Sequence, residues 1–217
     1  MVVIASFDAV TEHRYVAAWV PDDDPQRSWD DAADLAVEWL LREADRLGVA
    51  PLLVTPTKSQ WTSGAESIRR LAQNYEATTP RSSRPTSGQR SVLVYVPDYD
   101  TFHLAANYAH GSSLAVVESV TTPLRGWAME VAALNLLTGD RTPDTRTEEQ
   151  RRELDRLHFY GNNGWTTGFG KDQATRLLSD LQRRGLLDTD VVLGYMLAKG
   201  HHGKAIDRLA KIIGKLG

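Results

Sequence analysis

The sequence predicts an α/β fold, in which residues 1–140 form a mostly parallel three-layer sandwich and residues 147–217 form an all-helical region. Two observations lead to this prediction. Short β-branched apolar runs alternate with amphipathic helical patterns in the first region, and such an alternation implies parallel strands joined by crossover helices. Residues 139–146 then have the composition of a linker, and no strand pattern follows them.

Five apolar segments predict the strands of this sandwich, whose layout is similar to that of Rossmann-like folds. They cover residues 2–7, 15–20, 52–55, 91–96 and 114–118. The first two strands are expected to pair through the turn at residues 11–14. Residues 76–90 are mostly polar and predict a long loop.

Helical spacing of apolar residues predicts the helices, and polar residues are expected to begin those of the first region. The expected helices cover residues 30–47, 63–75, 100–110, 122–137, 147–159, 171–184, 189–199 and 203–215. Ser28 and Asp100 have the positions of N-caps. Ser63 and Glu66 have the spacing of a capping box, and Thr122 precedes a proline suited to the first helical position.

Composition excludes several classes of protein. The chain has no cysteine, which excludes disulfides, thiolate metal sites and cysteine nucleophiles. Its first apolar stretch reaches Asp8 within a few residues, so no secretory signal is predicted. No apolar run approaches the roughly 18 residues of a transmembrane helix. We therefore expect a cytoplasmic protein without a membrane span.

Charge is divided unevenly along the chain. Residues 1–150 carry 13 lysines and arginines against 21 aspartates and glutamates, a net charge of −8. Residues 151–217 carry 12 against 7, a net charge of +5. This asymmetry predicts a polyanionic partner for the basic part. The alternative is that the two parts pack against each other through complementary charge.

Five polar residues are expected at the carboxyl ends of the strands, where parallel sheets bind ligands. These candidate catalytic residues are Lys58, Asp98, Asp100, Glu118 and Arg125. Lys58 lies ahead of a predicted helix and could contact a phosphate, and the three acids could hold Mg²⁺. Together they indicate a Mg²⁺-dependent enzyme that processes nucleotides or transfers phosphoryl groups. The alternative is that Asp100 caps a helix and the others lie on the surface.

Other catalytic motifs fail at residues that their chemistry requires. A P-loop needs glycine where this chain has Trp165, and Ser or Thr where it has Asp172. A ribonuclease-H-like site lacks its third acid near Thr55. A nuclease of the restriction-enzyme type would have lysine at the position of Val120.

The basic region contains a glycine pattern that is similar to part of a known structural element. The segment Gly168-Phe-Gly-Lys-Asp-Gln-Ala174 resembles the hairpin and second helix of a helix-hairpin-helix element, and a looser copy begins at Gly200. Two such copies are similar to a tandem helix-hairpin-helix domain, a family that grips the DNA backbone without sequence preference. The resemblance implies that Gly168 and Gly170 let the backbone approach a phosphate. The implied phosphate contacts are Lys171, Arg176, Lys199, Lys204 and Lys211.

Three classes of function therefore remain. The first is binding of nucleic-acid backbone, which requires that the basic residues are not neutralised by the chain's own acids. The second is the strand-end enzyme. The third is a non-catalytic assembly or regulatory protein that binds a protein partner or a second copy of itself, and exposure of several of the six tryptophans would favour it. A plain helical bundle with glycine turns is the alternative to the helix-hairpin-helix arrangement.

Overall fold

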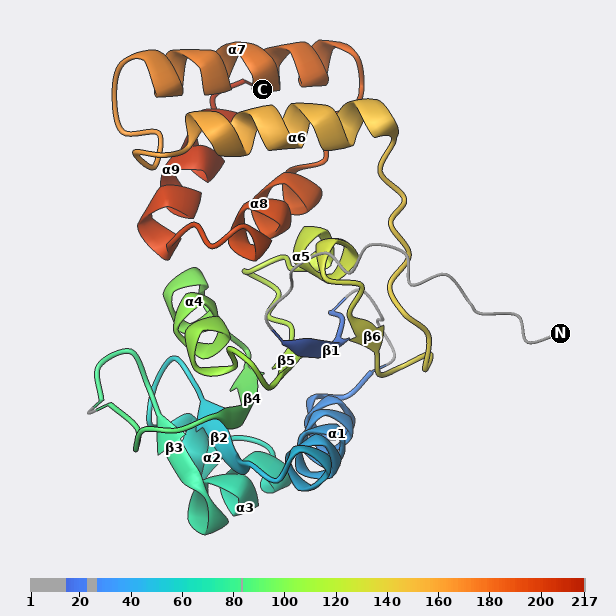
Figure 1. The fold of residues 1–217 in the computed structure, drawn as a ribbon, viewed down its shortest axis with the longest axis vertical. Helices are drawn as coiled ribbons and strands as arrows, with labels where there is room; N and C mark the ends of the chain where they lie inside the picture. Colours follow the sequence, from blue (N-terminus) through green and yellow to red (C-terminus); the bar gives the residue numbers. More distant parts are fainter. Residues whose placement is uncertain (1–14, 23–26, 83, 217) are drawn as a thin grey trace, which may run out of the picture.

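The structure is a computed structural model that describes residues 15–22, 27–82 and 84–216. Its centre is a six-stranded parallel sheet with the order β3-β2-β4-β5-β1-β6 (Figure 1). The strands are β1 (Val16–Val20), β2 (Ala50–Val54), β3 (Glu76–Thr78), β4 (Arg90–Tyr95), β5 (Ser113–Val117) and β6 (Leu134–Asn135). This sheet confirms the predicted α/β class.

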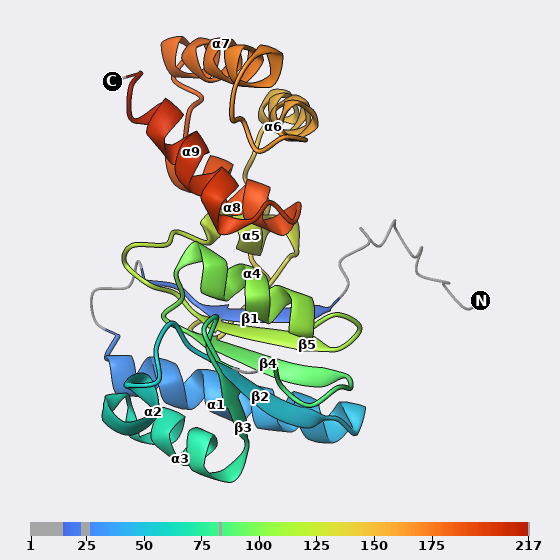
Figure 2. The same cartoon turned by 90° about the vertical axis from the view of Figure 1, so that its left-hand side faces the viewer.

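Helices cover both faces of the sheet, as Figure 2 shows. One face packs on α1 (Trp29–Leu47) and α3 (Glu66–Asn74), and the short α2 (Gln60–Ser63) lies beside α3. The other face packs on α4 (Tyr99–Tyr108) and α5 (Arg125–Glu130). Alternate residues of each strand enter the two cores, because successive side chains of a strand point to opposite faces.

The first described strand, β1, is an interior strand next to the edge strand β6. β1 is parallel to β5 on one side and to β6 on the other. The strand predicted over residues 2–7 and the turn at residues 11–14 lie outside the described residues, as does Asp8.

The predicted start and end of the first helix are confirmed. Ser28 caps α1 by accepting a hydrogen bond from the backbone N–H of Asp31 at 3.0 Å. Gly48 ends the helix in the left-handed conformation, at φ +65°, which glycine adopts without steric cost.

Three predicted caps were wrong, among them Thr122, because α5 begins after Leu124 without a side-chain cap. Ser63 ends α2 and does not cap the next helix, because α3 begins after Ala65 without a side-chain cap. Asp98, and not Asp100, caps α4 by accepting from the N–H of Thr101 at 2.7 Å. The sequence offers two aspartates at this helix start, and only backbone geometry selects between them.

The predicted loop over residues 76–90 and the predicted helix over residues 122–137 were also wrong in part. The loop begins with the edge strand β3, which pairs with β2. The helix is only α5, and it ends before Ala132, whose φ is +47°. The chain then turns back so that β6 pairs with β1, which adds a strand to the sheet edge.

Four helices follow the sheet, as predicted. They are α6 (Glu148–Tyr160), α7 (Phe169–Arg183), α8 (Thr189–Ala198) and α9 (Gly203–Ile213). α8 is buried along most of its length and lies between α5 and the other three helices (Figures 1 and 2). In the described part of the chain, no helix combines the length and apolar character needed to cross a bilayer.

The helical region joins the sheet through a close crossing of α5 and α8. A Cβ atom at Gly126 would overlap the carbonyl oxygen of Val191, and one at Gly194 would lie 2.7 Å from the backbone nitrogen of Trp127. Both glycines are therefore required for this approach. One cluster of buried residues runs from the sheet face through α4 and α5 into α8 and α9, so the linker in the sequence does not divide the core.

We expect Gly126→Ala to lower the free energy of unfolding by about 1–3 kcal/mol, because the added methyl must separate two packed backbones. Urea denaturation measures this change. Gly214→Ala is the matched control, because Gly214 has φ −62° and an added Cβ there would lie 3.4 Å from the Ala210 carbonyl oxygen. Equal midpoints for Gly126→Ala and the parent protein would contradict the close crossing.

Candidate anion-binding groove

The residues predicted at the strand ends do not converge on one site. Lys58 stands over the ring of Trp61, with its Nζ atom 5.5 Å from the ring centroid. Asp98 is occupied as the α4 cap. The Asp100 carboxylate lies against the first turn of α9 at Gly203, where a side chain would collide with it. A carboxylate at a helix N-terminus is favoured by the helix dipole.

Two of the five residues share a pocket. Glu118 and Arg125 line a hollow of about 240 Å³ at the ends of β1 and β5. Glu118 is buried and accepts hydrogen bonds from the backbone N–H groups of Leu124 and Asp22, at 2.5 and 2.8 Å. Asp190 of α8 also lines this pocket, and sequence reasoning missed it because it comes from the helical region.

The acids predicted to hold Mg²⁺ are thus separated by their structural roles. Within residues 15–22, 27–82 and 84–216, no three His, Asp or Glu side chains are grouped to hold a metal ion. The magnesium site stays a prediction from the sequence.

Half of the cations in the basic region have carboxylate partners. Arg183 and Arg184 pair with Asp180, Arg152 and Arg156 with Glu153, Arg151 with Asp144, and Lys199 with Glu130. The other six have no carboxylate of the described residues within ion-pair distance. These are Lys171, Arg176, Lys204, Arg208, Lys211 and Lys215.

Three of these six form a stripe along α9. Lys204, Arg208 and Lys211 lie within about 60° of arc on the helix, since each residue advances by about 100°. The opposite side of α9 is apolar and enters the core. Lys215 continues the cationic side in the turn after the helix.

A groove of about 390 Å³ lies between the C-terminal part of this stripe and α7, and Lys204 is outside its lining. Its charged lining consists of Lys171 from α7 and Arg208, Lys211 and Lys215 from the C-terminal segment, without a carboxylate. The apolar lining comes from Trp165, Ile212 and Leu216. We call this hollow the basic groove. Four cations around one hollow repel one another, and an anionic ligand would relieve that repulsion.

The loop between α6 and α7 forms one end of the basic groove and is held by a histidine pair. His158 Nδ1 and His201 Nε2 are 2.9 Å apart, and the His201 ring packs on Trp165 with centroids 4.5 Å apart. Trp165 is 1% exposed and has φ +54°, a conformation that non-glycine residues rarely adopt. Arg208 donates to the Gly164 carbonyl at 3.3 Å, which joins the loop to α9.

Both histidines have pKa values below the ordinary value of an imidazole. Burial, then the nearby His158 and His202, lower the pKa of His201 to about 4. Burial and the positive charge of Lys199 also lower the pKa of His158, against a smaller opposing effect of Asp155. A hydrogen bond between two imidazoles needs one ring nitrogen without a proton, so protonation of both rings would break it.

We expect the free energy of unfolding to fall as the pH drops from about 6.5 to about 4. In this range His201 is protonated in the unfolded chain but not in the folded one, so protons favour the unfolded state. His201→Gln should flatten this part of the profile, measured by urea denaturation at several pH values. The exposed His110 supplies the control His110→Gln. An unchanged slope in His201→Gln would contradict the account of the loop.

Lys199 differs from the other predicted phosphate contacts because it is paired with a carboxylate. Its Nζ atom lies 2.7 Å from a Glu130 carboxylate oxygen, and Glu130 also accepts from Arg146 at 2.7 Å. Burial raises the pKa of Glu130, but the bonds from Lys199 and Arg146 outweigh it and lower that pKa overall. Lys199 therefore joins α8 to α5. Arg176 is exposed on α7 outside the basic groove.

The glycines of the helix-hairpin-helix pattern serve helix packing in part. A Cβ at Gly170 would lie 2.6 Å from the Tyr160 carbonyl oxygen, so this glycine lets α7 approach the end of α6. Gly203 plays the same role against Asp100. Gly168 is exposed at the start of α7 with φ +69° and open space around it. Of these three glycines, Gly168 alone leaves its backbone accessible to a ligand.

Comparison of this chain with protein-family models, with curated proteins and with solved structures found no match.

Proposed function

We propose that the protein binds the phosphate backbone of nucleic acid in the basic groove between α7 and α9. The observation that supports this proposal is the concentration of four unpaired cations in a hollow without carboxylates. Elsewhere in the basic region, Arg156 of α6 and Arg183 and Arg184 at the end of α7 are paired with acids three or four residues away. The positive charge of the groove is therefore a local feature and not a property of the whole surface.

The arrangement favours contacts to phosphate and not to bases. Lysine ammonium groups are compact donors on flexible stems that neutralise phosphates without reading sequence. From Lys204 to Lys211 the stripe is about 10 Å long, which spans about three phosphates of one strand. Lys171 stands on the opposite wall. The proposed phosphate contacts are therefore Lys171, Lys204 and Lys211, which the sequence predicted, together with Arg208 and Lys215. Lys199, which the sequence also predicted, is not among them.

We expect binding of a generic duplex to weaken steeply as salt rises, because phosphate neutralisation releases counterions. Lys211→Gln should weaken binding equally for unrelated sequences. It should also reduce the slope of log affinity against log salt concentration by about one. Fluorescence anisotropy with a labelled duplex measures both quantities.

Arg69→Gln is the matched control, because it removes an exposed cation of α3 that has no carboxylate of the described residues within ion-pair distance. It should leave the affinity and the salt slope unchanged. Affinity that does not depend on salt, or an equal effect of Lys211→Gln and Arg69→Gln, would overturn the proposal.

The other two classes of function have less support. A Mg²⁺-dependent nucleotide or phosphoryl enzyme would need its strand-end residues in one cleft, and only Glu118 and Arg125 line the same pocket. An assembly or regulatory protein would be favoured by several exposed tryptophans, but Trp19, Trp39, Trp127 and Trp165 are buried. Trp29, at 40% exposure, is the most accessible of the described tryptophans.

A further inference from the structure

Three aromatic side chains meet where α6 ends and α7 begins. The ring centroids of Phe159 and Tyr160 are 5.7 Å apart, and those of Tyr160 and Phe169 are 5.8 Å apart, both in edge-to-face geometry. Phe159 is 68% exposed and Phe169 is 70% exposed. We call these three residues the aromatic patch.

The aromatic patch differs from the rest of the described surface because its exposed apolar side chains are neighbours. Other exposed large apolar side chains of the described residues, such as Val16, Tyr75 and Val120, come from separate elements. Single exposed apolar residues are normal, whereas neighbouring exposed rings mark an interaction surface. Neither phenylalanine belongs to a buried core cluster, so their ring faces are available to a ligand.

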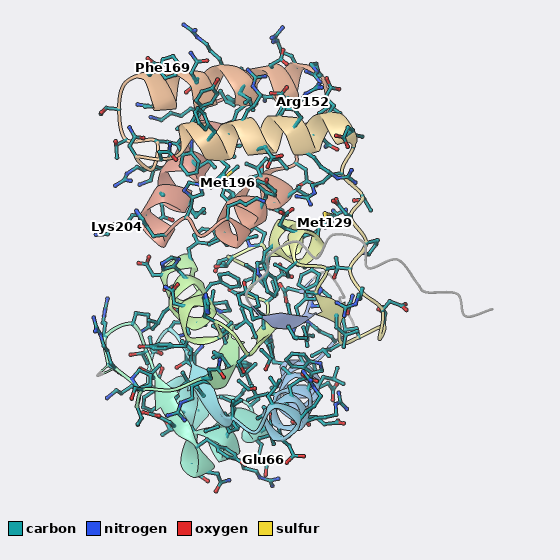
Figure 3. All side chains as sticks on the ribbon, in the orientation of Figure 1. Glu66, Met129, Arg152, Phe169, Met196 and Lys204 are labelled. Atoms are coloured by element: carbon teal, nitrogen blue, oxygen red, sulfur yellow. The ribbon has the colours of Figure 1, made fainter. Side chains whose placement is uncertain are left out.

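Cations flank the patch on both helices. Arg152, Arg156 and Phe159 recur at helical spacing along α6, and Phe169 and Arg176 lie two turns apart on one side of α7. Arg152 and Arg156 share one carboxylate, Glu153, and keep more than half of their side chains exposed. Phe169 and Arg152 lie at the end of the molecule farthest from Glu66, on the outer helices (Figure 3).

The patch is next to the basic groove. Lys171 lines the groove, and Phe169 lies two residues earlier on the first turn of the same helix. Since two residues advance a helix by about 200°, their side chains leave that turn on opposite sides. A strand that leaves the groove therefore reaches the aromatic patch by passing around the start of α7.

We propose that the aromatic patch stacks on unpaired bases, so that the ligand of the basic groove is single-stranded nucleic acid. The inference rests on the proposed function and adds its substrate class. Aromatic rings beside a cationic track bind single strands because each base offers a flat face to the ring, whereas paired bases inside a duplex do not. Arg152 and Arg156 are paired with Glu153. Arg176, which has no carboxylate of the described residues within ion-pair distance, and Lys171 of the groove therefore supply the charge complementarity that favours an anionic chain over an uncharged apolar partner.

The test compares a single-stranded oligonucleotide with the blunt duplex of the same sequence, using the full chain. The parent protein should bind the single strand more tightly. Phe159→Ala and Phe169→Ala should each weaken single-strand binding by about 5- to 150-fold and leave duplex binding and its salt slope unchanged. Phe169→Tyr keeps the ring and should retain binding. Tyr75→Ala, which removes an exposed ring of the opposite face of the sheet, is the control.

The outcomes separate this inference from the proposed function. If Phe159→Ala and Phe169→Ala bind the single strand as tightly as the parent while Lys211→Gln weakens binding, the patch has no stacking role and only this inference fails. If the parent binds neither nucleic acid, both fail. Binding to anionic phospholipid vesicles that depends on the two phenylalanines, without such dependence for the single strand, would assign the patch to membranes and overturn the inference. Circular dichroism of each variant verifies that it is folded.

Discussion

The crossing of α5 and α8 at Gly126 and Gly194 is the contact on which the rest of the molecule depends. Two glycines without side chains let the helix backbones approach closely, and a methyl group at either position would strike backbone atoms that cannot move aside. α8 is buried on nearly all sides. α6 and α9 pack on α8, and α7 packs on those two helices, so α8 links the helical region to the sheet.

Charged groups support this crossing from its edge. Glu130 of α5 accepts from Lys199 of α8 and from Arg146 of the linker. The Tyr195 ring lies between these two cations, 5.1 Å from the Arg146 guanidinium carbon and 4.9 Å from Lys199 Nζ. Removing one of these three charged side chains would leave a buried charge without its partner. The free-energy cost of that unpaired charge exceeds the stability that the ion pair contributes. Lys199 is therefore a structural cation of the crossing.

The other cations of the helical region are distributed unevenly over the helices. On α6 and at the end of α7, away from the groove, Arg156, Arg183 and Arg184 pair with acids three or four residues away. Where α7 faces α9, the acids are missing and four cations line the same hollow. Stability alone would favour a carboxylate in that hollow, since like charges repel. The anionic ligand proposed above would explain why none is there.

Much of the fold was readable from the sequence, because it depends on local patterns. The strands near residues 16–20, 50–54 and 90–95 have short apolar runs, and α1 has a serine cap and a terminal glycine. The short β3 and β6 were missed, since two or three residues carry no periodicity and exist only because a neighbouring strand offers hydrogen bonds.

The candidate site was predictable only in part for the same reason. Lys171 and Lys211 were identified from charge and from the glycine pattern, and both line the groove. The ion pair of Lys199 with Glu130 joins residues 69 positions apart, which no local pattern indicates. Trp165 enters the groove through an unusual backbone conformation held by two histidines, and the sequence carries no signal for it.

The most direct test of the central claim is lysine acetylation measured by mass spectrometry, with and without a bound oligonucleotide. The chain has six lysines, which serve as internal references for one another. We expect the oligonucleotide to protect Lys171, Lys211 and Lys215, while Lys58 and Lys199 react as they do in the free protein. Protection of Lys58 together with unchanged reaction of the three groove lysines would contradict the account and place the ligand at the strand ends.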